Sequence, residues 1–466
     1  MTLLSPDQVE FEVTVDVAIV GGGGCGLSAA LSAQQAGAEV LVLERDASTL
    51  GTTAMSTGLI PAAGSRFQKA AGIDDSPSQF ANDILAKAKG QTDLDIVAAL
   101  AVESATTVHW LADCGVPLSL VDSFLYPGHT AMRMHGTPNR TGSELMGSLS
   151  QATERADIGV LTEATVTELV ADKNGRIHGL RCQRPDGSHE DVGCRALVLA
   201  CCGFAGNPQM LGEYIPEILA AEFFGHPGNK GDAIRWGRAL GAAIADIHSY
   251  QGHGGLAAGY GIPILWPVIM EGGFQVNAEG QRFSDESRGY SEQAVEVVAQ
   301  PGHVAWTLYD ERLHQLMQEF DDYRDAIAAK AIRSADSAAE LAEILGLPQT
   351  AVEATFAQVA QSTTSGEPDA FGRKFASRAV LAPPYYGVKV TGALFHTQGG
   401  LVVDRHGQVK RPDGTLLPNL FAGGGAARGV SGPSCWGYLA GNGLLTATTF
   451  GRLAGTAAAR LTRDPS

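Results

Sequence analysis

The hydrophobic pattern near the start of the chain alternates between short apolar runs and one helical stretch. Residues 15–20 form an apolar run rich in β-branched residues, which predicts a buried parallel strand. Residues 27–36 have helical character and stop at Gly37, and residues 40–43 form a second apolar run that ends at Glu44. This order predicts a strand–helix–strand unit.

The middle of the chain changes from helical spacing to hairpins. Apolar residues within 92–113 recur at the spacing of one helix face. Between residues 160 and 200 the pattern predicts strands, with Asn174-Gly175 and Asp186-Gly187 at two hairpin turns. Residues 195–204 then predict a buried strand that runs into a glycine turn.

The last third of the chain returns to the pattern of the first. Residues 336–362 predict two helices separated by Leu347-Pro348, and residues 399–409 and 416–432 predict strands followed by a glycine loop. A final helix is expected over about residues 443–461. We therefore predict an α/β fold, in which a nucleotide-binding sheet is built from both chain ends and the middle segment is inserted.

The first predicted turn has the spacing of a dinucleotide site. Gly21, Gly23 and Gly26 fit G-x-G-x-x-G directly after the strand. Such glycines allow a tight turn and let a pyrophosphate lie on a helix N-terminus, while an acid such as Glu44 binds a ribose hydroxyl. Residues 48–65 are small and hydroxyl-rich, as expected of a loop under a flavin, and a second fingerprint for NAD is missing.

Composition narrows the class of protein. The 466 residues suffice for two or more domains, and the net charge of −17 argues against nucleic acid or an anionic membrane as a partner. The seven cysteines lack metal-binding spacing, so we expect no metal site and predict buried free thiols in a reducing compartment. Because no basic leader and no apolar span of about 18 residues occurs, we predict a cytoplasmic protein.

The chain resembles the flavoprotein family of fumarate and urocanate reductases and 3-ketosteroid dehydrogenases. The resemblance extends from Val15 to Gly455 and rests on the fingerprint, "TTAMSTG", "ACCGF", "GNKGDAI", "GQRFSDE", "HTQGGLVVD" and "NLFAGG…GNGLLTATTFGRLAG". It implies a Rossmann-like FAD domain of residues 1–247 and 395–466 and an α+β capping domain of residues 248–394. The FAD is expected to be non-covalent, since no histidine lies in "LGTTAMSTG".

The resemblance also implies which residues hold the FAD. They lie in the fingerprint, the loop after it, the returning strand and the start of the last helix: Gly21, Gly23, Gly24, Gly26, Glu44, Arg45, Thr52, Thr53, Ala54, Ser56, Val166, Ala200, Gly203, Asp232, Gly423, Gly424, Asn442, Gly443, Leu444 and Leu445. At Gly424 relatives often carry an acid that helps to hold the ribityl chain, so that contact must come from elsewhere.

Two tyrosines stand where the fumarate-reducing relatives carry arginines. Tyr290 lies eight residues after the arginine of "RF", where those relatives have a proton-delivering arginine and the ketosteroid enzymes have a tyrosine. Tyr438, before the last helix, replaces a carboxylate-binding arginine. In the ketosteroid enzymes a tyrosine here and the N–H of a glycine matching Gly441 hold the ketone oxygen, as an oxyanion hole does.

Three further residues are candidates for the substrate pocket. His396 and His253 match positions where fumarate reductases bind substrate carboxylates, and each has the alternative of being a satisfied structural histidine. Tyr126 lies near a third pocket tyrosine of the ketosteroid enzymes, with core packing as an equal alternative. Arg133 and Arg140 either bind an anion or are solvated.

The resemblance, with tyrosines at both arginine positions, implies an FAD-dependent desaturase of a small cyclic ketone such as cyclohexanone. If both histidines line the pocket, 4-oxocyclohexanecarboxylate would also fit. The alternatives are an ene-reductase or dicarboxylate dehydrogenase of the fumarate, urocanate or tricarballylate type, and a non-catalytic flavin-binding subunit. The sequence identifies neither the electron acceptor nor the oligomeric state.

Overall fold

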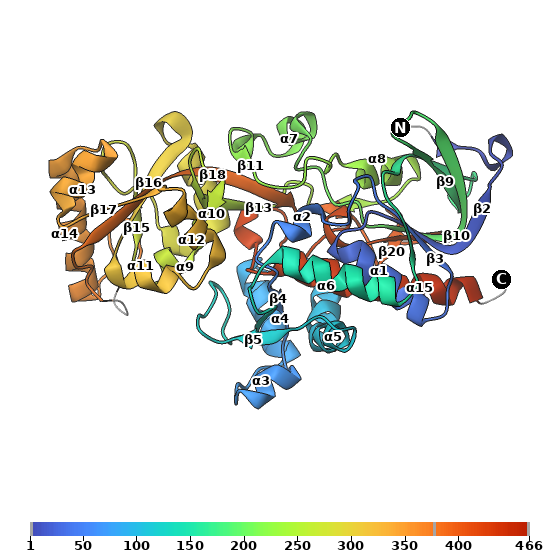
Figure 1. Ribbon diagram of the computed structural model, residues 1–466, viewed down its shortest axis with the longest axis horizontal. Helices are drawn as coiled ribbons and strands as arrows, with labels where there is room; N and C mark the ends of the chain where they lie inside the picture. Colours follow the sequence, from blue (N-terminus) through green and yellow to red (C-terminus); the bar gives the residue numbers. More distant parts are fainter. Residues whose placement is uncertain (1–2, 376–378, 464–466) are drawn as a thin grey trace. The chain divides into compact units, whose positions relative to one another are not determined.

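The computed structural model describes residues 3–375 and 379–463 (Figure 1). The chain divides into two compact units. Unit 1 is Met1–Met210, Gly225–Tyr250 and His396–Ser466, and unit 2 is Leu211–Phe224 and Gln251–Phe395. The domain boundaries expected from the sequence stay a prediction, and at residues 1–2, 376–378 and 464–466 they include positions outside the described residues.

Unit 1 is built on a mainly parallel sheet. The strands β7, β3, β2, β10 and β21 lie side by side and parallel, and β9 and β8 continue the sheet as antiparallel hairpins. Within the described residues the sheet comprises β1 (Leu3–Leu4), β2 (Val13–Val20), β3 (Val40–Leu43), β7 (Gly159–Leu161), β8 (Thr165–Ala171), β9 (Ile177–Gln183), β10 (His189–Leu199), β20 (Gln408–Lys410) and β21 (Leu416–Ala422). The predicted α/β class is confirmed.

The two chain ends meet through helices α1 and α15, which lie side by side (Figure 1). Their backbones approach closely, because a Cβ at Gly455 of α15 would lie 2.1 Å from the Ala29 carbonyl oxygen of α1. The described helices of unit 1 are α1 (Gly24–Gln35), α2 (Gly51–Ala54), α3 (Arg66–Ala70), α4 (Pro77–Lys87), α5 (Leu94–Asp113), α6 (Gly142–Arg155), α8 (Asp232–Ala239) and α15 (Asn442–Arg463), and α7 (Pro208–Tyr214) crosses the unit boundary.

Helix α5 corrects one expectation from the sequence. By length and composition it is apolar enough to cross a membrane, with a mean hydropathy of 1.2 over its best window, although no such span was expected. The core helix of a soluble protein passes the same test. Ile96, Val97, Leu100 and Leu111 of α5 are buried, and the helix packs against α4 and α15. Part of the apolar surface of α5 is thus buried within unit 1, whereas Leu94 and Val102 are exposed.

Three shorter strands pair near the start of α15. Strands β4 (Ile60–Pro61), β5 (Ser119–Val121) and β6 (Met134–Gly136) form a small antiparallel sheet, and β12 (Ile244–Ala245) pairs with β19 (Gly400–Leu401). Strand β4 contacts α15. The small sheet therefore lies beside the N-terminal part of the last helix.

Unit 2 is organised around the long strand β18 (Tyr385–Thr397), whose last two residues belong to unit 1. Its sheet has the order β14 (Ile262–Pro263), β13 (Tyr250–Ala257), β18, β16 (Val304–Asp310) and β15 (Phe274–Val276), and β11 (Glu222–Phe223) and β17 (Ile332–Ala335) also pair with β18. Because β11 pairs with β18, residues 211–224 belong to unit 2, whereas the sequence placed them in the FAD domain.

The helices of unit 2 surround a core of aromatic and aliphatic side chains that includes Trp266, Phe274 and Tyr323. They are α9 (Pro267–Met270), α10 (Tyr290–Val298), α11 (Glu311–Met317), α12 (Asp321–Ala328), α13 (Ala338–Leu345) and α14 (Gln349–Ser365). The break between α13 and α14 falls at Leu347-Pro348, as predicted.

Candidate active site

A cavity in unit 1 opens where the parallel strands end. Val20 of β2, Leu43 of β3 and Ala200 after β10 line it together with the glycine turn of the fingerprint. In open parallel sheets, ligands bind outside the carboxyl ends of the strands. The position of the cavity is therefore that of a nucleotide site.

The glycine turn has the geometry that the fingerprint predicts. Gly21 has a φ of +103°, and a Cβ at Gly26 would lie 1.8 Å from the Gly21 carbonyl oxygen, so neither position accepts a side chain without rearrangement. The N–H of Gly22 donates to Glu44 Oε2 at 2.6 Å, and the N–H of Asp46 donates to Glu44 Oε1 at 3.0 Å. The turn and the acid are thus fixed to each other at the start of α1.

Two buried polar atoms of residues that line the cavity lack partners among the described residues, namely Arg45 Nε and Trp236 Nε1. Both polar side-chain atoms of Asn442, which is not a lining residue, also lack partners. Buried donors and acceptors are normally hydrogen-bonded, so such orphans indicate a polar ligand. The N-terminus of α1, whose first residue Gly24 lines the cavity, suits a pyrophosphate. The residues present therefore fit FAD.

The cavity brings together about half of the residues predicted to hold FAD. Those that line it are Gly21, Gly23, Gly24, Glu44, Arg45, Thr52, Thr53, Val166, Ala200, Asp232 and Gly424. The others are not among the lining residues, namely Gly26, Ala54, Ser56, Gly203, Gly423, Asn442, Gly443, Leu444 and Leu445. Their contact with FAD stays a prediction, and for Leu445 the structure shows a place in the hydrophobic core.

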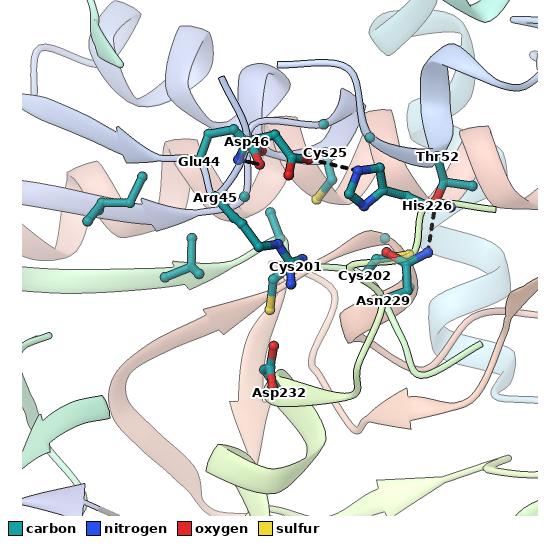
Figure 2. Close-up of a pocket in the computed structure, with 18 of the residues that line it drawn as sticks. Cys25, Glu44, Arg45, Asp46, Thr52, Cys201, Cys202, His226, Asn229 and Asp232 are labelled. Carbon is teal, nitrogen blue, oxygen red and sulfur yellow. Dashed lines mark hydrogen bonds and ion pairs between the residues drawn. The ribbon is translucent and has the colours of Figure 1, made fainter. Parts of the chain in front are cut away.

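Some lining residues were not predicted from the sequence. His226 Nε2 pairs with Asp46 at 2.7 Å, and Asn229 Nδ2 donates to Thr52 Oγ1 at 2.8 Å (Figure 2). Asp46 directly follows the predicted Glu44 and Arg45, which was an available signal. His226 and Asn229 lie in the loop before α8 and reach the cavity only through the tertiary fold.

The cysteine thiols that line the cavity are expected to be unreactive at neutral pH. Cys25, Cys201 and Cys202 line it, and burial raises the pKa of each thiol, to about 12 for Cys25. The thiolate is the reactive form of cysteine, so at neutral pH these side chains are protonated and act as small apolar groups.

Tyr438 forms a second cluster in unit 1, at the start of α15. The phenol is buried, and its oxygen accepts a hydrogen bond from the Gly443 N–H at 3.3 Å. A Cβ at Gly443 would lie 2.7 Å from His396 Nε2 and 3.4 Å from the Tyr438 oxygen, so both polar atoms border this glycine. Burial raises the pKa of Tyr438 well above its usual range. The hydroxyl therefore keeps its proton and serves as a donor, not as a base.

His396 is a neutral member of this cluster. Burial lowers the pKa of its imidazole to about 4. The Gln398 Nε2 amide lies 3.1 Å from His396 Nδ1, and the Ser431 hydroxyl donates to Gln398 Oε1 at 2.9 Å. His396 Nδ1 also lies 3.3 Å from the Thr397 carbonyl oxygen, and Nε2 is the ring nitrogen beside Gly443. The cluster thus offers neutral hydrogen-bonding groups and no fixed charge.

The loop that carries Tyr126 packs beside the Tyr438 segment. Tyr126 is half-buried against Phe124, with ring centroids 5.1 Å apart, and burial raises the pKa of its phenol. In the same loop a Cβ at Gly128 would lie 2.7 Å from a Leu439 methyl group. Arg133 neither binds an external anion nor is solvated, because it is 1% exposed and pairs with carboxylates of its own unit.

Unit 2 brings His253 and Tyr290 together. The Tyr290 ring stacks on the His253 ring, with the ring centroids 5.3 Å apart. His253 also stacks on Phe395, with centroids 5.3 Å apart, and lies nearly perpendicular to Trp266, with centroids 5.5 Å apart. Burial lowers the pKa of His253 to about 3. Its Nδ1 accepts the Gly255 N–H at 3.1 Å, so the proton of this neutral ring is on Nε2.

A buried ion network holds the segment before Tyr290. Glu286 is 1% exposed and accepts hydrogen bonds from Arg282 Nε at 3.0 Å, Arg373 at 2.9 Å and the Gln275 N–H at 2.9 Å. Burial alone would raise the pKa of Glu286, but the two guanidinium groups outweigh it and the pKa is lowered. The acid of "GQRFSDE" is therefore structural, and it anchors the turn that leads into α10.

Comparison with known proteins agrees with the nucleotide cavity. The FAD binding domain family matches residues 16–444, so the chain belongs to that family. The chain is 28% identical over 452 residues to a fumarate reductase (cytochrome) of Shewanella frigidimarina, which covers 97% of this chain and 78% of the relative.

Two solved structures are similar over nearly the whole chain. A flavocytochrome c3 fumarate reductase in an open conformation has a TM-score of 0.82 and 27% identity, and the match covers 97% of this chain and 79% of that one. A 3-ketosteroid-delta4-(5alpha)-dehydrogenase from Rhodococcus jostii, in complex with 4-androstene-3,17-dione, has a TM-score of 0.79 and 25% identity, with coverage of 98% and 100%.

The resemblance predicted from the sequence is confirmed, and FAD is the cofactor. The protein is an FAD-dependent oxidoreductase of the family that contains the fumarate reductases, and it acts on carbon–carbon bonds. Non-covalent attachment of the flavin and a cytoplasmic location stay predictions.

Proposed function

We propose that this protein removes two hydrogens from adjacent carbons of a small cyclic ketone and so forms the α,β-unsaturated ketone. The observation that carries the proposal is the Tyr438 hydroxyl, which is buried, protonated and hydrogen-bonded by the Gly443 N–H. A phenol whose oxygen accepts a hydrogen bond is a stronger donor through its own proton. Such a donor suits a carbonyl oxygen on which negative charge develops.

The proposed roles of the residues follow from that charge. Tyr438 and the Gly441 N–H hold the carbonyl oxygen, and this polarisation acidifies the hydrogen on the α-carbon. Tyr290 takes that hydrogen as a proton. Bound FAD supplies the two-electron acceptor, so the hydrogen of the β-carbon leaves as a hydride. The ketone thereby loses one proton and one hydride, and a carbon–carbon double bond forms.

The surroundings of Tyr290 support its role as the base. Tyr290 is the first residue of α10, where the helix dipole favours a negative charge. An ordinary phenol has a pKa near 10, so a base at neutral pH needs such stabilisation of the phenolate. The stacked His253 is neutral and presents its donor nitrogen, Nε2, away from the Gly255 backbone.

The charge of the histidines favours an uncharged ring as substrate. His253 and His396 match positions where fumarate reductases bind a carboxylate, but burial lowers the pKa of each imidazole, so neither offers a positive charge at neutral pH. A carboxylate binds best to charged donors. Cyclohexanone is therefore the preferred probe over 4-oxocyclohexanecarboxylate.

A reductase of the fumarate, urocanate or tricarballylate type is the second candidate, since the matched relative from Shewanella frigidimarina is a fumarate reductase. A dianion requires cationic partners. Two buried or partly buried guanidinium groups of unit 1 are already neutralised, as Arg133 pairs with Asp75 and Asp83, and Arg428 pairs with Asp93 and Asp246. This charge balance favours the ketone.

The test is an anaerobic titration of the yellow holoenzyme. Cyclohexanone and 4-oxocyclohexanecarboxylate are added separately, the flavin absorbance is followed, and the product is identified by mass spectrometry as the ketone less two hydrogens. The proposal predicts bleaching by cyclohexanone. Absence of bleaching with saturated ketones, together with reoxidation of the reduced enzyme by fumarate or urocanate, contradicts the proposal and favours the reductase.

A further inference from the structure

The peptide between Ala440 and Gly441 is held on one side by a buried histidine. His129 Nε2 lies 2.9 Å from the Ala440 carbonyl oxygen. A carbonyl oxygen only accepts hydrogen bonds, so the ring proton is on Nε2. His129 is buried, and burial lowers the pKa of its imidazole to about 4, which leaves a neutral ring of one tautomer at neutral pH.

The guanidinium group of Arg133 orients this histidine from the Nδ1 side of its ring. Arg133 NH1 lies 3.5 Å from His129 Nδ1, the nitrogen without a proton. The same guanidinium donates to Asp83 Oδ2 at 2.6 Å and to both oxygens of Asp75 at 3.0 Å, and it lies 4.6 Å from the centre of the Phe80 ring. A chain of buried charged groups thus ends on one backbone carbonyl.

The peptide is fixed on the other side by close packing. Gly441 has a φ of +83°, and a Cβ there would lie 2.7 Å from Pro61 Cδ and 3.3 Å from Met134 Sδ. A trans peptide is planar, so its N–H points opposite to its C=O. The Gly441 N–H is consequently directed away from His129.

We propose that His129, oriented by Arg133, is a positioning residue that sets the direction and donor strength of the Gly441 N–H. A hydrogen bond to the carbonyl oxygen polarises the whole amide and strengthens its N–H as a donor. The inference rests on the proposed function, in which this N–H holds the substrate oxygen. It adds that the site binds ring oxyanions, the chemical class of an enolate, more tightly than neutral oxygens.

The cost of the arrangement supports this role. Burying an arginine with two aspartates carries a desolvation penalty that apolar packing of the same volume avoids. Asp83 also accepts the Thr130 N–H at 2.9 Å, so the network holds the loop that carries His129. Within that loop, Arg133 faces His129 Nδ1 and keeps the ring proton on Nε2, where it meets the Ala440 oxygen.

The experiment compares two substitutions of the same residue in the holoenzyme. His129→Leu removes the donor, whereas His129→Gln can place an amide N–H where Nε2 stood. His135→Leu is the matched control, since His135 is also a buried, neutral histidine of unit 1 but bonds Ser65 at 2.7 Å. Binding of a series of para-substituted phenols of increasing acidity is measured from the change in flavin absorbance.

A second measurement follows the NMR signal of the Gly441 amide in the peptide between Ala440 and Gly441. In deuterated holoenzyme with 13C-carbonyl alanine and 15N-glycine, only Ala–Gly peptides give a correlated signal, and the Gly441 signal is identified by its loss in Gly441→Ala. We expect His129→Leu to shift this amide resonance and to weaken binding of the most acidic phenol about tenfold, as loss of polarisation at one donor of an oxyanion site does. His129→Gln restores both, and His135→Leu changes neither.

The outcomes separate the inference from the function on which it rests. If His129→Leu leaves both the Gly441 resonance and the phenol series at the wild-type values, the inference is overturned. If the wild type is not reduced by ketones and binds no phenol, while the Gly441 resonance still shifts in His129→Leu and returns in His129→Gln, the ketone function fails and the positioning role is supported.

Discussion

At the scale of single residues, the chemistry depends on a phenol that keeps its proton. We predict that Tyr438→Phe lowers the rate of flavin reduction by cyclohexanone about 10²–10³-fold, the usual effect of removing one oxyanion donor. FAD content and fold are expected to be unchanged, because phenylalanine retains the ring. The measurement is anaerobic stopped-flow absorbance.

The matched control for this variant is Tyr309→Phe in unit 2. Tyr309 is also a buried phenol with a raised pKa, and it bonds Tyr323 at 2.7 Å. It is expected to lose some stability and to keep the rate of flavin reduction. Equal rates in Tyr438→Phe and the wild type would remove Tyr438 from the reaction.

At the scale of elements, the turn before α15 is fixed by the absence of a side chain. Gly441→Ala is predicted to destabilise the protein by about 1–3 kcal/mol more than Gly241→Ala, because the added methyl group overlaps Pro61. Gly241 is the control, since its φ of +78° carries the same backbone strain while nothing lies within 4 Å of its Cβ position. Urea unfolding of both variants measures the difference, and equal values would contradict the packing account.

The turn that leads into α10 depends on a buried carboxylate. Glu286→Gln is predicted to lower the free energy of unfolding by about 3–5 kcal/mol, because buried Arg373 loses this carboxylate and Arg282 keeps only its pair with Asp369. The control is Asp321→Asn, which breaks the exposed pair with Arg324 and should cost less than about 1 kcal/mol. Equal losses of unfolding free energy in the two variants would show that the buried network stabilises the protein no more than an exposed ion pair does.

The elements with strong local patterns were predicted well from the sequence. Strand β3 was predicted with its exact ends and α15 within two residues, because apolar periodicity and flanking glycines act over a few positions. Residues 51–54 were expected to be a loop but form the short helix α2. The structure groups residues 211–224 with unit 2, where β11 pairs with β18 at positions about 170 residues apart, and no local pattern records such a pairing.

The same distinction holds for the candidate site. The fingerprint and Glu44 were predicted because they lie within one strand–helix–strand unit, and the tyrosines were proposed because relatives have functional residues there. His226 and the chain from Asp75 and Arg133 to Ala440 were missed. Each depends on contacts between segments far apart in the sequence.

At the scale of the whole molecule, buried neutral histidines make stability depend on pH. Burial lowers the pKa of four of them: His129, His135 and His396 to about 4, and His253 to about 3. An unfolded histidine has a pKa near 6.5, so below that pH the unfolded chain binds protons that the folded chain does not. Their stabilising contribution is complete above about pH 6.5 and is lost as the pH falls toward 4.

The expected slope can be measured with the holoenzyme. Between pH 6.5 and 5, each of these histidines should lower the free energy of unfolding by about 1 kcal/mol per pH unit. His129→Gln removes one titrating ring and should reduce the slope by that amount. A slope that is the same in the variant and the wild type would show that His129 is not held neutral by the fold.

The central claim is that the enzyme draws a proton from the α-carbon of a ketone, and one measurement tests it most directly. The rate of anaerobic flavin reduction is compared for cyclohexanone with hydrogen or deuterium at its α-carbons, in the wild type and in Tyr290→Phe. We predict a primary isotope effect in the wild type and near-complete loss of reduction in the variant. Flavin reduction that is equally fast with α-deuterium and without the Tyr290 hydroxyl, or no reduction by the ketone at all, would contradict the account.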